Sequence, residues 1–250
     1  MTAKSPRMSS FQVVLLIAAS FLSSLGAAQN ADQAYLTPPL DIADIVDAQP
    51  TPAVSVDPAK SWMLILGRPG LPSITELSQP ELRIAGLRIN PANNGGSRSS
   101  YYNSLTLQSL ENGGSRVIIG LPANPRIRDV SWSPDSSRIA FTLDQGDHIE
   151  LWLAEVDSAS ARRLIVSEMN GLFGAPFSWM SDSFRLLVKA VPDSRGPEPE
   201  EPAVPSGPVI QESTGRPAAA RTYQDLMENS HDEELLEYYG QVQLLMVHVS

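Results

Sequence analysis

Cysteine is absent from this 250-residue sequence, and histidine occurs only at His148, His231 and His248. The lack of cysteine excludes disulfides, thiolate nucleophiles, cysteine-ligated zinc and a lipid-modified cysteine. Three scattered histidines provide little material for a metal centre or a catalytic triad. The sequence therefore predicts no cofactor, no metal site and no catalytic residue within this chain.

Positive charge is also scarce, because 18 Lys and Arg residues stand against 28 Asp and Glu residues and give a net charge of −10. Nucleic-acid binding depends on a basic face, so this balance argues against DNA or RNA as a partner. Hydrophobic residues make up 42% of the chain, which is enough to form a core. The 21 prolines and 16 glycines favour many turns and few long helices.

The longest uncharged stretch covers residues 8–31 and follows two basic residues near the N-terminus. Its apolar centre, residues 11–25, is shorter than the roughly 20 residues of a membrane span and has the length of a signal-peptide core. Small residues up to Ala28 fit cleavage at that point. We expect residues 1–28 to be a signal peptide, with export to the periplasm or extracellular space and no membrane contact after cleavage. The alternative is an uncleaved membrane anchor.

Two segments 47 residues apart share one pattern, which begins at Trp132 and at Trp179. Both have an aspartate three residues after the tryptophan, then a serine, an arginine and alternating apolar residues. A weaker copy begins at Ser55. The spacing is close to the roughly 40–50 residues of a four-stranded propeller blade.

The repeat predicts a strand, a tight turn and a second strand in each unit. The residues that define it are Trp132, Pro134, Asp135, Trp179 and Asp182. Proline presets the backbone of the turn and aspartate bonds the amides that follow, while the tryptophans are expected to pack between neighbouring sheets. The sequence therefore predicts an all-β fold, a partial β-propeller of about four blades of which the last is incomplete.

The amino-acid composition changes in the C-terminal part of the chain. Residues 192–221 are rich in proline and are expected to form an insertion loop. Capping-box patterns predict two short helices, over residues 223–229 and 231–239, before a further strand. The predicted domains are thus a signal peptide (1–28), an N-terminal extension (29–54) and a partial propeller (55–250). Because an unclosed blade array exposes strand edges, we expect the chain to be an N-terminal piece of a longer protein.

Several strings carry a resemblance that covers nearly all of residues 35–249. They are Tyr35-Leu-Thr-Pro38-Pro39, Leu71-Pro-Ser-Ile-Thr-Glu-Leu77, Pro80-Glu-Leu-Arg83-Ile-Ala-Gly86-Leu-Arg88-Ile-Asn-Pro91, Trp132-Ser-Pro-Asp135, Gly207-Pro-Val-Ile-Gln-Glu212, Arg221-Thr-Tyr223-Gln-Asp225-Leu and His231-Asp-Glu233. With these strings the sequence resembles the N-terminal part of the secreted bacterial and plastid glutamyl-endopeptidase-like proteins of the prolyl oligopeptidase superfamily. One departure is Ser136, where propellers of this type often have glycine.

The resemblance implies a β-propeller that caps an α/β-hydrolase domain with a Ser-Asp-His triad. That domain is missing here, because no G-x-S-x-G string occurs; the nearest strings, at Gly95–Ser99 and Gly113–Val117, lack the final glycine. The expected function is that of a propeller fragment of a secreted serine peptidase, with a glutamyl preference, that limits the access of peptide or protein substrates. The alternative is a stand-alone exported propeller that acts as a binding or scaffold module. No oligomeric state is predicted.

Two groups of acidic residues are candidate sites. The turn with Asp144, Asp147, His148 and Glu150 matches no calcium or zinc spacing, so a solvated turn is expected. In the wider superfamily, helices like the one that carries Asp232, Glu233 and Glu234 bind a substrate's N-terminal amine, which makes these three residues candidates for facing substrate. Stabilisation of the positive helix N-terminus is the alternative role. Arginines such as Arg83, Arg88, Arg126, Arg128 and Arg221 are candidate partners for a glutamyl side chain.

Overall fold

The computed structural model describes residues 38–164, 166–204, 207, 212, 215 and 223–249. The predicted signal peptide lies outside the described residues. The chain divides into two compact units, Met1–Val46 and Asp47–Ser250. The described part of the first unit forms helix α2 (Leu40–Val46), which buries no side chain. No helix in the described part of the chain is long and apolar enough to cross a lipid bilayer.

The second unit is built from four antiparallel sheets. Sheet 1 has the order β1 (Ala53–Val56), β2 (Trp62–Gly67), β6 (Ser104–Ser109) and β7 (Ser115–Val117). Sheet 2 has the order β8 (Ile127–Trp132), β9 (Arg138–Asp144), β10 (Ile149–Glu155) and β11 (Ser160–Leu164). Sheet 3 contains β12 (Phe177–Trp179), β13 (Arg185–Ala190) and β14 (Gln243–His248). A small inserted sheet contains β3 (Leu82–Ile84), β4 (Leu87–Asn90) and β5 (Gly95–Gly96).

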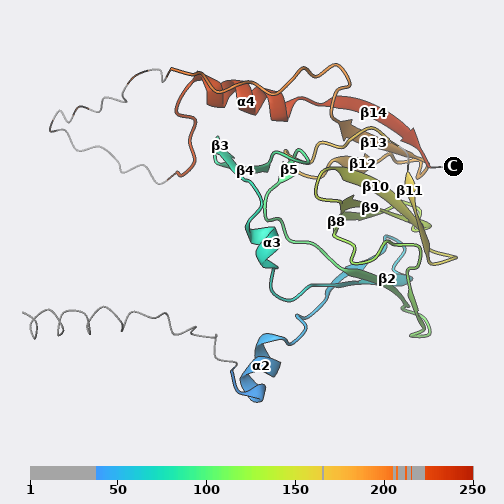
Figure 1. Cartoon of the computed structure of the whole chain (residues 1–250). Coiled ribbons are helices and arrows are strands. Elements are labelled where there is room, and N and C mark those ends of the chain that lie inside the picture. Colours follow the sequence, from blue (N-terminus) through green and yellow to red (C-terminus); the bar gives the residue numbers. More distant parts are fainter. Residues whose placement is uncertain are drawn as a thin grey trace, which may run out of the picture. The chain divides into compact units, whose positions relative to one another are not determined.

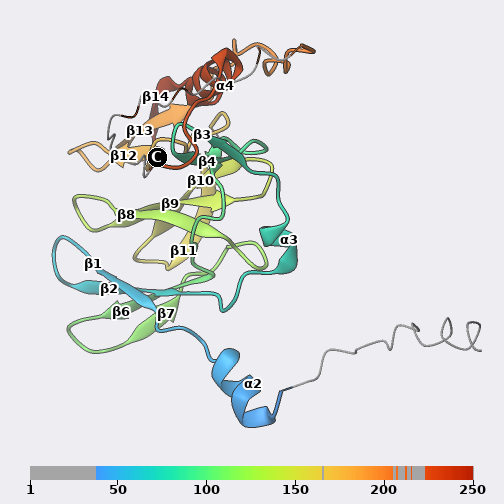
Figure 2. The same ribbon diagram turned by 90° about the vertical axis from the view of Figure 1, so that its left-hand side faces the viewer.

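Sheets 1, 2 and 3 lie as successive layers (Figure 2). Sheet 2 is buried on both faces because its strands alternate between two apolar cores. Ile139 and Phe141 of β9 pack against sheet 1, while Ala140 and the β10 residues Leu151 and Leu153 pack against sheet 3. This layering of antiparallel sheets, two with four strands and one with three in the described residues, confirms the all-β prediction.

Two insertions leave the layered sheets at corresponding points, each between a second and a third strand. The first, between β2 and β6, contains helix α3 (Ile74–Leu77) and the inserted sheet. The second, between β13 and β14, contains helix α4 (Ser230–Gly240) (Figure 1). The two insertions share a third core, in which Ile84 and Ile89 pack with Leu235 and Tyr239. The prediction of about four blades compares with four antiparallel sheets in the described residues: three form the layered series, and the fourth is the inserted sheet.

The prediction of two short helices near the C-terminus is half right. Helix α4 forms as expected, although Asn229 rather than Ser230 is its N-cap and accepts from the Asp232 amide. Residues 223–229 are not helical. Asp225 has a φ of 57°, and its carbonyl accepts a 2.7 Å hydrogen bond from the Gly86 amide in the β3–β4 turn. This contact with the inserted sheet holds the segment out of a helix, so the local capping signal is overridden.

Candidate functional site

The two repeat tryptophans lie between the layered sheets. Trp132 contacts the core of sheets 1 and 2, and its Nε1 donates to Ser55 Oγ at 3.1 Å. Trp179 contacts the core of sheets 2 and 3, and its Nε1 donates to the Ser131 carbonyl at 3.2 Å. Each indole therefore joins its own sheet to the preceding one by both packing and a hydrogen bond.

The two repeat aspartates organise the turns that follow the tryptophans. Asp135 Oδ1 accepts from the Ser133 hydroxyl at 2.6 Å and from the Ser137 amide at 3.1 Å. Asp182 Oδ1 accepts from two amides in the same way, and its Oδ2 pairs with Arg185 at 2.6 Å. The exposed Pro134 occupies the turn ahead of Asp135. These side chains have local hydrogen-bond partners that fully explain their position.

The acidic residues of α4 have different surroundings. Asp232 Oδ2 accepts from the Glu228 amide at 2.7 Å and so stabilises the start of its own helix. Glu233 is exposed at the rim of a shallow depression that also contains Phe173, Met227 and Leu236. Glu234 is exposed. A role in substrate binding remains a prediction for these residues.

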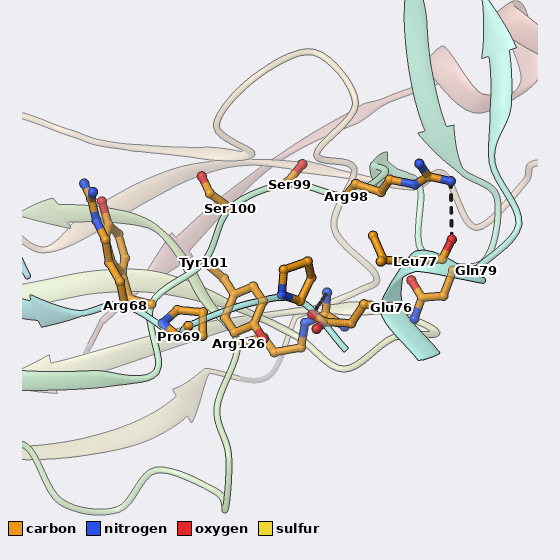
Figure 3. A pocket seen from close by; sticks show the side chains of 13 residues that line it. Arg68, Pro69, Glu76, Leu77, Gln79, Arg98, Ser99, Ser100, Tyr101 and Arg126 are labelled. Atoms are coloured by element: carbon orange, nitrogen blue, oxygen red, sulfur yellow. Dashed lines mark hydrogen bonds and ion pairs between the residues drawn. The ribbon is translucent and has the colours of Figure 1, made fainter. Parts of the chain in front are cut away.

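The main cavity of the second unit has a volume of about 560 Å³ and lies beside helix α3 (Figure 3). Three arginines line it, together with one acidic residue, Glu76. The wall residues are Arg68, Pro69, Gly70, Pro72, Glu76, Leu77, Gln79, Arg98, Ser99, Ser100, Tyr101, Tyr102 and Arg126. In a chain with a net charge of −10, this excess of guanidinium groups suits an anionic ligand.

Glu76 and Arg126 neutralise one another on one side of the cavity. Arg126 Nη2 lies 3.3 Å from Glu76 Oε1, and its guanidinium stacks 4.9 Å from the Tyr101 ring centroid. Burial by itself raises the pKa of Glu76, but hydrogen bonds from Ser73 and Tyr101 outweigh it and hold the pKa below its usual value. Burial and the Glu76 carboxylate raise the pKa of Tyr101. This side of the cavity is thus a fixed network of charges.

The opposite side of the cavity keeps charge available for a ligand. Arg68 is exposed and has no hydrogen bond or ion pair with a described residue. Arg98 donates to the Leu77 carbonyl at 3.3 Å and lies 3.4 Å from Glu81 (Figure 3). Ser99 and Ser100, which follow Arg98 along the chain, also line the cavity. The arrangement can hold a carboxylate by hydrogen bonds from a guanidinium and neighbouring hydroxyls.

Of the arginines that the sequence pointed out, Arg126 alone reaches this cavity. Arg83 and Arg88 lie against Glu81, and Arg128 lies 3.9 Å from Asp144. Arg221 lies outside the described residues. Sequence analysis missed Arg68, Arg98 and Tyr101, whose neighbours are set by the fold. The capping box of α3, formed by Ser73 and Glu76, was a local signal that could have located one wall.

The turn before His148 is solvent-exposed at Gln145 and Asp147, as the sequence suggested, but Glu150 on the strand that follows is buried. Glu150 is only 7% exposed, and its carboxylate accepts from Gln145, Trp152 and Arg163 at 2.8–2.9 Å. His148 bridges this carboxylate, at 3.2 Å, and that of Asp147, at 2.7 Å. Glu150 is buried because its carboxylate faces the protein, where the Trp152 indole and the Arg163 guanidinium supply hydrogen-bond donors. No group of acidic and histidine residues in the described part is placed to hold a metal ion.

This bridge predicts a pH-dependent stability. Burial lowers the pKa of His148, but the hydrogen bonds to Asp147 and Glu150 outweigh it and raise the pKa above the usual 6.5. Because the folded state binds the proton more tightly, the stabilisation is complete below pH 6.5 and is lost as the pH rises through the folded-state pKa. Urea unfolding at pH 5.5 and 8.5 should show His148→Gln losing more stability at the lower pH. Equal losses at both pH values would contradict the bridge.

The comparisons with known proteins found two relatives that match most of this chain. The chain is 38% identical over 231 residues to a probable chloroplastic glutamyl endopeptidase of Oryza sativa subsp. japonica. The aligned region covers 87% of this chain and 24% of that protein. A protein of the same name from Arabidopsis thaliana is 37% identical over 225 residues, 85% of this chain and 23% of that protein. The chain thus spans about a quarter of the length of the curated relatives it matches. No protein-family model matches it.

Solved structures give more distant likenesses. An acylaminoacyl peptidase of Pyrococcus horikoshii is 17% identical with a TM-score of 0.32, over 56% of this chain and 17% of that chain. The β-propeller domain of the Trilobed protease from Pyrococcus furiosus is 15% identical with a TM-score of 0.33, over 56% of this chain and 35% of that chain.

The layered antiparallel sheets define the chain as part of a β-propeller. The identity with the two plant proteins goes further, because it extends over most of the chain. The resemblance to the glutamyl-endopeptidase-like proteins seen in the sequence is thereby confirmed.

Proposed function

We propose that this chain is the propeller segment of a serine peptidase and has no peptidase activity by itself. The observation that carries the proposal is the 38% identity, over 87% of the chain, to a protein named glutamyl endopeptidase. The chain has no G-x-S-x-G string and no cysteine, so it lacks the usual nucleophiles of peptide hydrolysis. The serine nucleophile would therefore belong to a hydrolase domain outside these 250 residues.

In that protein the layered sheets would limit which substrates reach the hydrolase domain. A glutamyl side chain needs a cationic partner, and the cavity beside α3 offers Arg68, which has no partner among the described residues. We propose this cavity as the place where an acidic side chain of the peptide is held. Export through a signal peptide at residues 1–28 is part of the same proposal, and the chloroplastic relatives are likewise proteins that are sent to a compartment.

The test compares the 250-residue chain with the complete gene product. A fluorophosphonate probe, which labels active serine hydrolases, should label the gene product and leave the 250-residue chain unlabelled. The gene product should cleave a glutamyl peptide faster than its glutaminyl counterpart. In the gene product, Arg68→Gln should lower kcat/KM for the glutamyl peptide by about tenfold, the effect of one lost charge-assisted hydrogen bond, and leave the glutaminyl peptide unaffected.

Arg83→Gln is the matched control, because Arg83 is also exposed but lies outside the cavity. Probe labelling of the 250-residue chain, or an unlabelled gene product, would contradict the peptidase proposal. An unchanged preference for glutamate in the Arg68→Gln variant would instead contradict only the role of the cavity.

A further inference from the structure

Three asparagines are followed directly by glycine, at Asn94, Asn112 and Asn170. In such a pair the backbone nitrogen of the glycine can attack the asparagine side chain, because glycine has no side chain of its own to hinder the approach. The same two residues occur in all three places. A difference in their reactivity therefore has to come from the fold.

The first pair, Asn94 and Gly95, is locked inside the molecule. Asn94 is 4% exposed, and its Oδ1 accepts a hydrogen bond from Arg195 at 2.5 Å. The Gly95 amide donates to Asn93 Oδ1 at 3.0 Å, so the nitrogen that would attack is bonded elsewhere. A Cβ on Gly95 would lie 3.0 Å from Ile149 Cδ1, which leaves the backbone little room to move.

The pair of Asn170 and Gly171 is locked in a similar way. Asn170 is 1% exposed, and its Nδ2 donates to the carbonyls of Tyr239 and Gln241 at 2.7 and 3.0 Å. This nitrogen is the one that must leave in a deamidation, and two hydrogen bonds hold it. The Gly171 amide donates to the Asn94 carbonyl at 3.0 Å, so the two buried pairs brace each other.

The pair of Asn112 and Gly113 has the opposite surroundings. It lies between β6 and β7, in a stretch that is exposed throughout residues 110–117. A Cβ on Gly113 would meet no atom within 4 Å, and Asn112 Nδ2 donates to no described residue. The Gly113 amide donates to the Ser109 carbonyl at 3.0 Å, within the same turn. Because local opening of an exposed turn costs little free energy, this nitrogen is readily released.

The turn also activates the asparagine side chain. The Gly114 amide donates to Asn112 Oδ1 at 2.9 Å. This oxygen gains negative charge when a nitrogen attacks Cγ, so the donor stabilises the transition state in the manner of an oxyanion hole. Asn112 therefore combines a free leaving group, a polarised carbonyl and an accessible neighbouring nitrogen.

We propose that Asn112 is a site of spontaneous deamidation, while Asn94 and Asn170 stay intact. The Gly113 nitrogen loses its proton to hydroxide and attacks Asn112 Cγ. The new C–N bond closes a cyclic imide, and the Cγ–Nδ2 bond breaks to release ammonia, which takes a proton from water and so regenerates the hydroxide. Water then opens the imide at either of its carbonyls and gives aspartate or isoaspartate. This inference stands apart from the peptidase proposal, because it depends only on the β6–β7 turn.

The fold tolerates this modification. The hairpin is attached to sheet 2 away from its tip, because the Arg116 guanidinium donates to the carbonyls of Val156 and Asp157. These bonds do not involve the Asn112 side chain. The product is therefore a folded chain that carries one more negative charge than the net −10 of the sequence.

The test follows all three asparagines in one sample. The chain is incubated in a mildly alkaline buffer, and mass spectrometry of its peptides measures deamidation at each position. In the folded chain Asn112 should convert at least about tenfold faster than Asn94 and Asn170, because the two buried pairs react only after structure around them opens. In concentrated urea the three rates should become similar, since the three pairs consist of the same two residues.

Asn112→Gln is the matched variant, because glutamine keeps the amide but would have to close a larger ring. Isoelectric focusing of the incubated wild-type chain should show a more acidic species that accumulates with time, and the variant should lack it. Equal rates at the three asparagines in the folded chain would overturn the proposal. So would an Asn112 that converts in urea but stays intact in the folded chain, and so would an acidic species that persists in the variant.

Discussion

Replacing Trp132 by alanine is expected to lower the free energy of unfolding by about 3 kcal/mol. The substitution leaves a gap between sheets 1 and 2, where the indole packs beside Ile139 and Phe141, and removes the hydrogen bond to Ser55. Chemical denaturation of the 250-residue chain measures the loss as a shift of the midpoint. Both the packing and the polar bond contribute, so the effect should exceed that of any surface change.

Trp132→Phe separates the two contributions. Phenylalanine keeps most of the packing but cannot donate to Ser55, so the expected loss is about 1 kcal/mol, the net value of one hydrogen bond. A Trp132→Ala loss no larger than that of Trp132→Phe would mean that the indole does not hold the sheets together. Trp152 offers a comparison within the same sheet, because its Nε1 donates to Glu150 rather than to another sheet.

The second large effect is expected for Glu150→Ala, with a loss of about 3 kcal/mol. Glu150 is 7% exposed, and its carboxylate makes hydrogen bonds or ion pairs with Trp152, Gln145, His148 and Arg163. Without it, the partly buried Trp152 indole loses its hydrogen-bond acceptor, and a donor kept from water without a partner is costly. Thermal unfolding monitored at neutral pH provides the measurement.

Glu150→Gln is the control, because glutamine has the same shape and retains one acceptor oxygen. It should lose clearly less stability than Glu150→Ala. It should also weaken the pH dependence attributed to His148, since one of the two carboxylates that the histidine bridges becomes a neutral amide while Asp147 remains. If the alanine variant were as stable as the wild type, the network would be only a surface arrangement.

Local patterns made the layered sheets predictable. The alternation from Arg138 to Asp144 gives strand β9, whose odd-numbered residues contact one core and whose Ala140 contacts the other. The hairpin of β6 and β7, around Asn112 and the two glycines that follow, was predictable because turn chemistry is local. Such signals depend on residues only a few positions apart along the chain, so they can be recognised without knowing the tertiary structure.

Contacts between distant residues overrode or escaped the same reasoning. The helix expected at residues 223–229 is absent because Asp225 bonds to Gly86 in the inserted sheet. Residues 82–96 showed no sign that they would leave sheet 1 and pack beside α4. The sequence placed Glu150 in a solvated turn, because one of its hydrogen-bond donors, Arg163, comes from a neighbouring strand that the local pattern does not include.

The sequence by itself determined that the chain is an acidic, cysteine-free, all-β repeat, through its composition, the repeated tryptophan turn and the strand periodicity. It also carried the resemblance to the relatives. These features follow from composition and from neighbours along the chain. Only the tertiary structure decided the shared core of the two insertions and the arginine-lined cavity beside α3. Each of these depends on side chains brought together by folding, as when Asn170 donates to the carbonyl of Tyr239, 69 positions away. No local pattern contains that information.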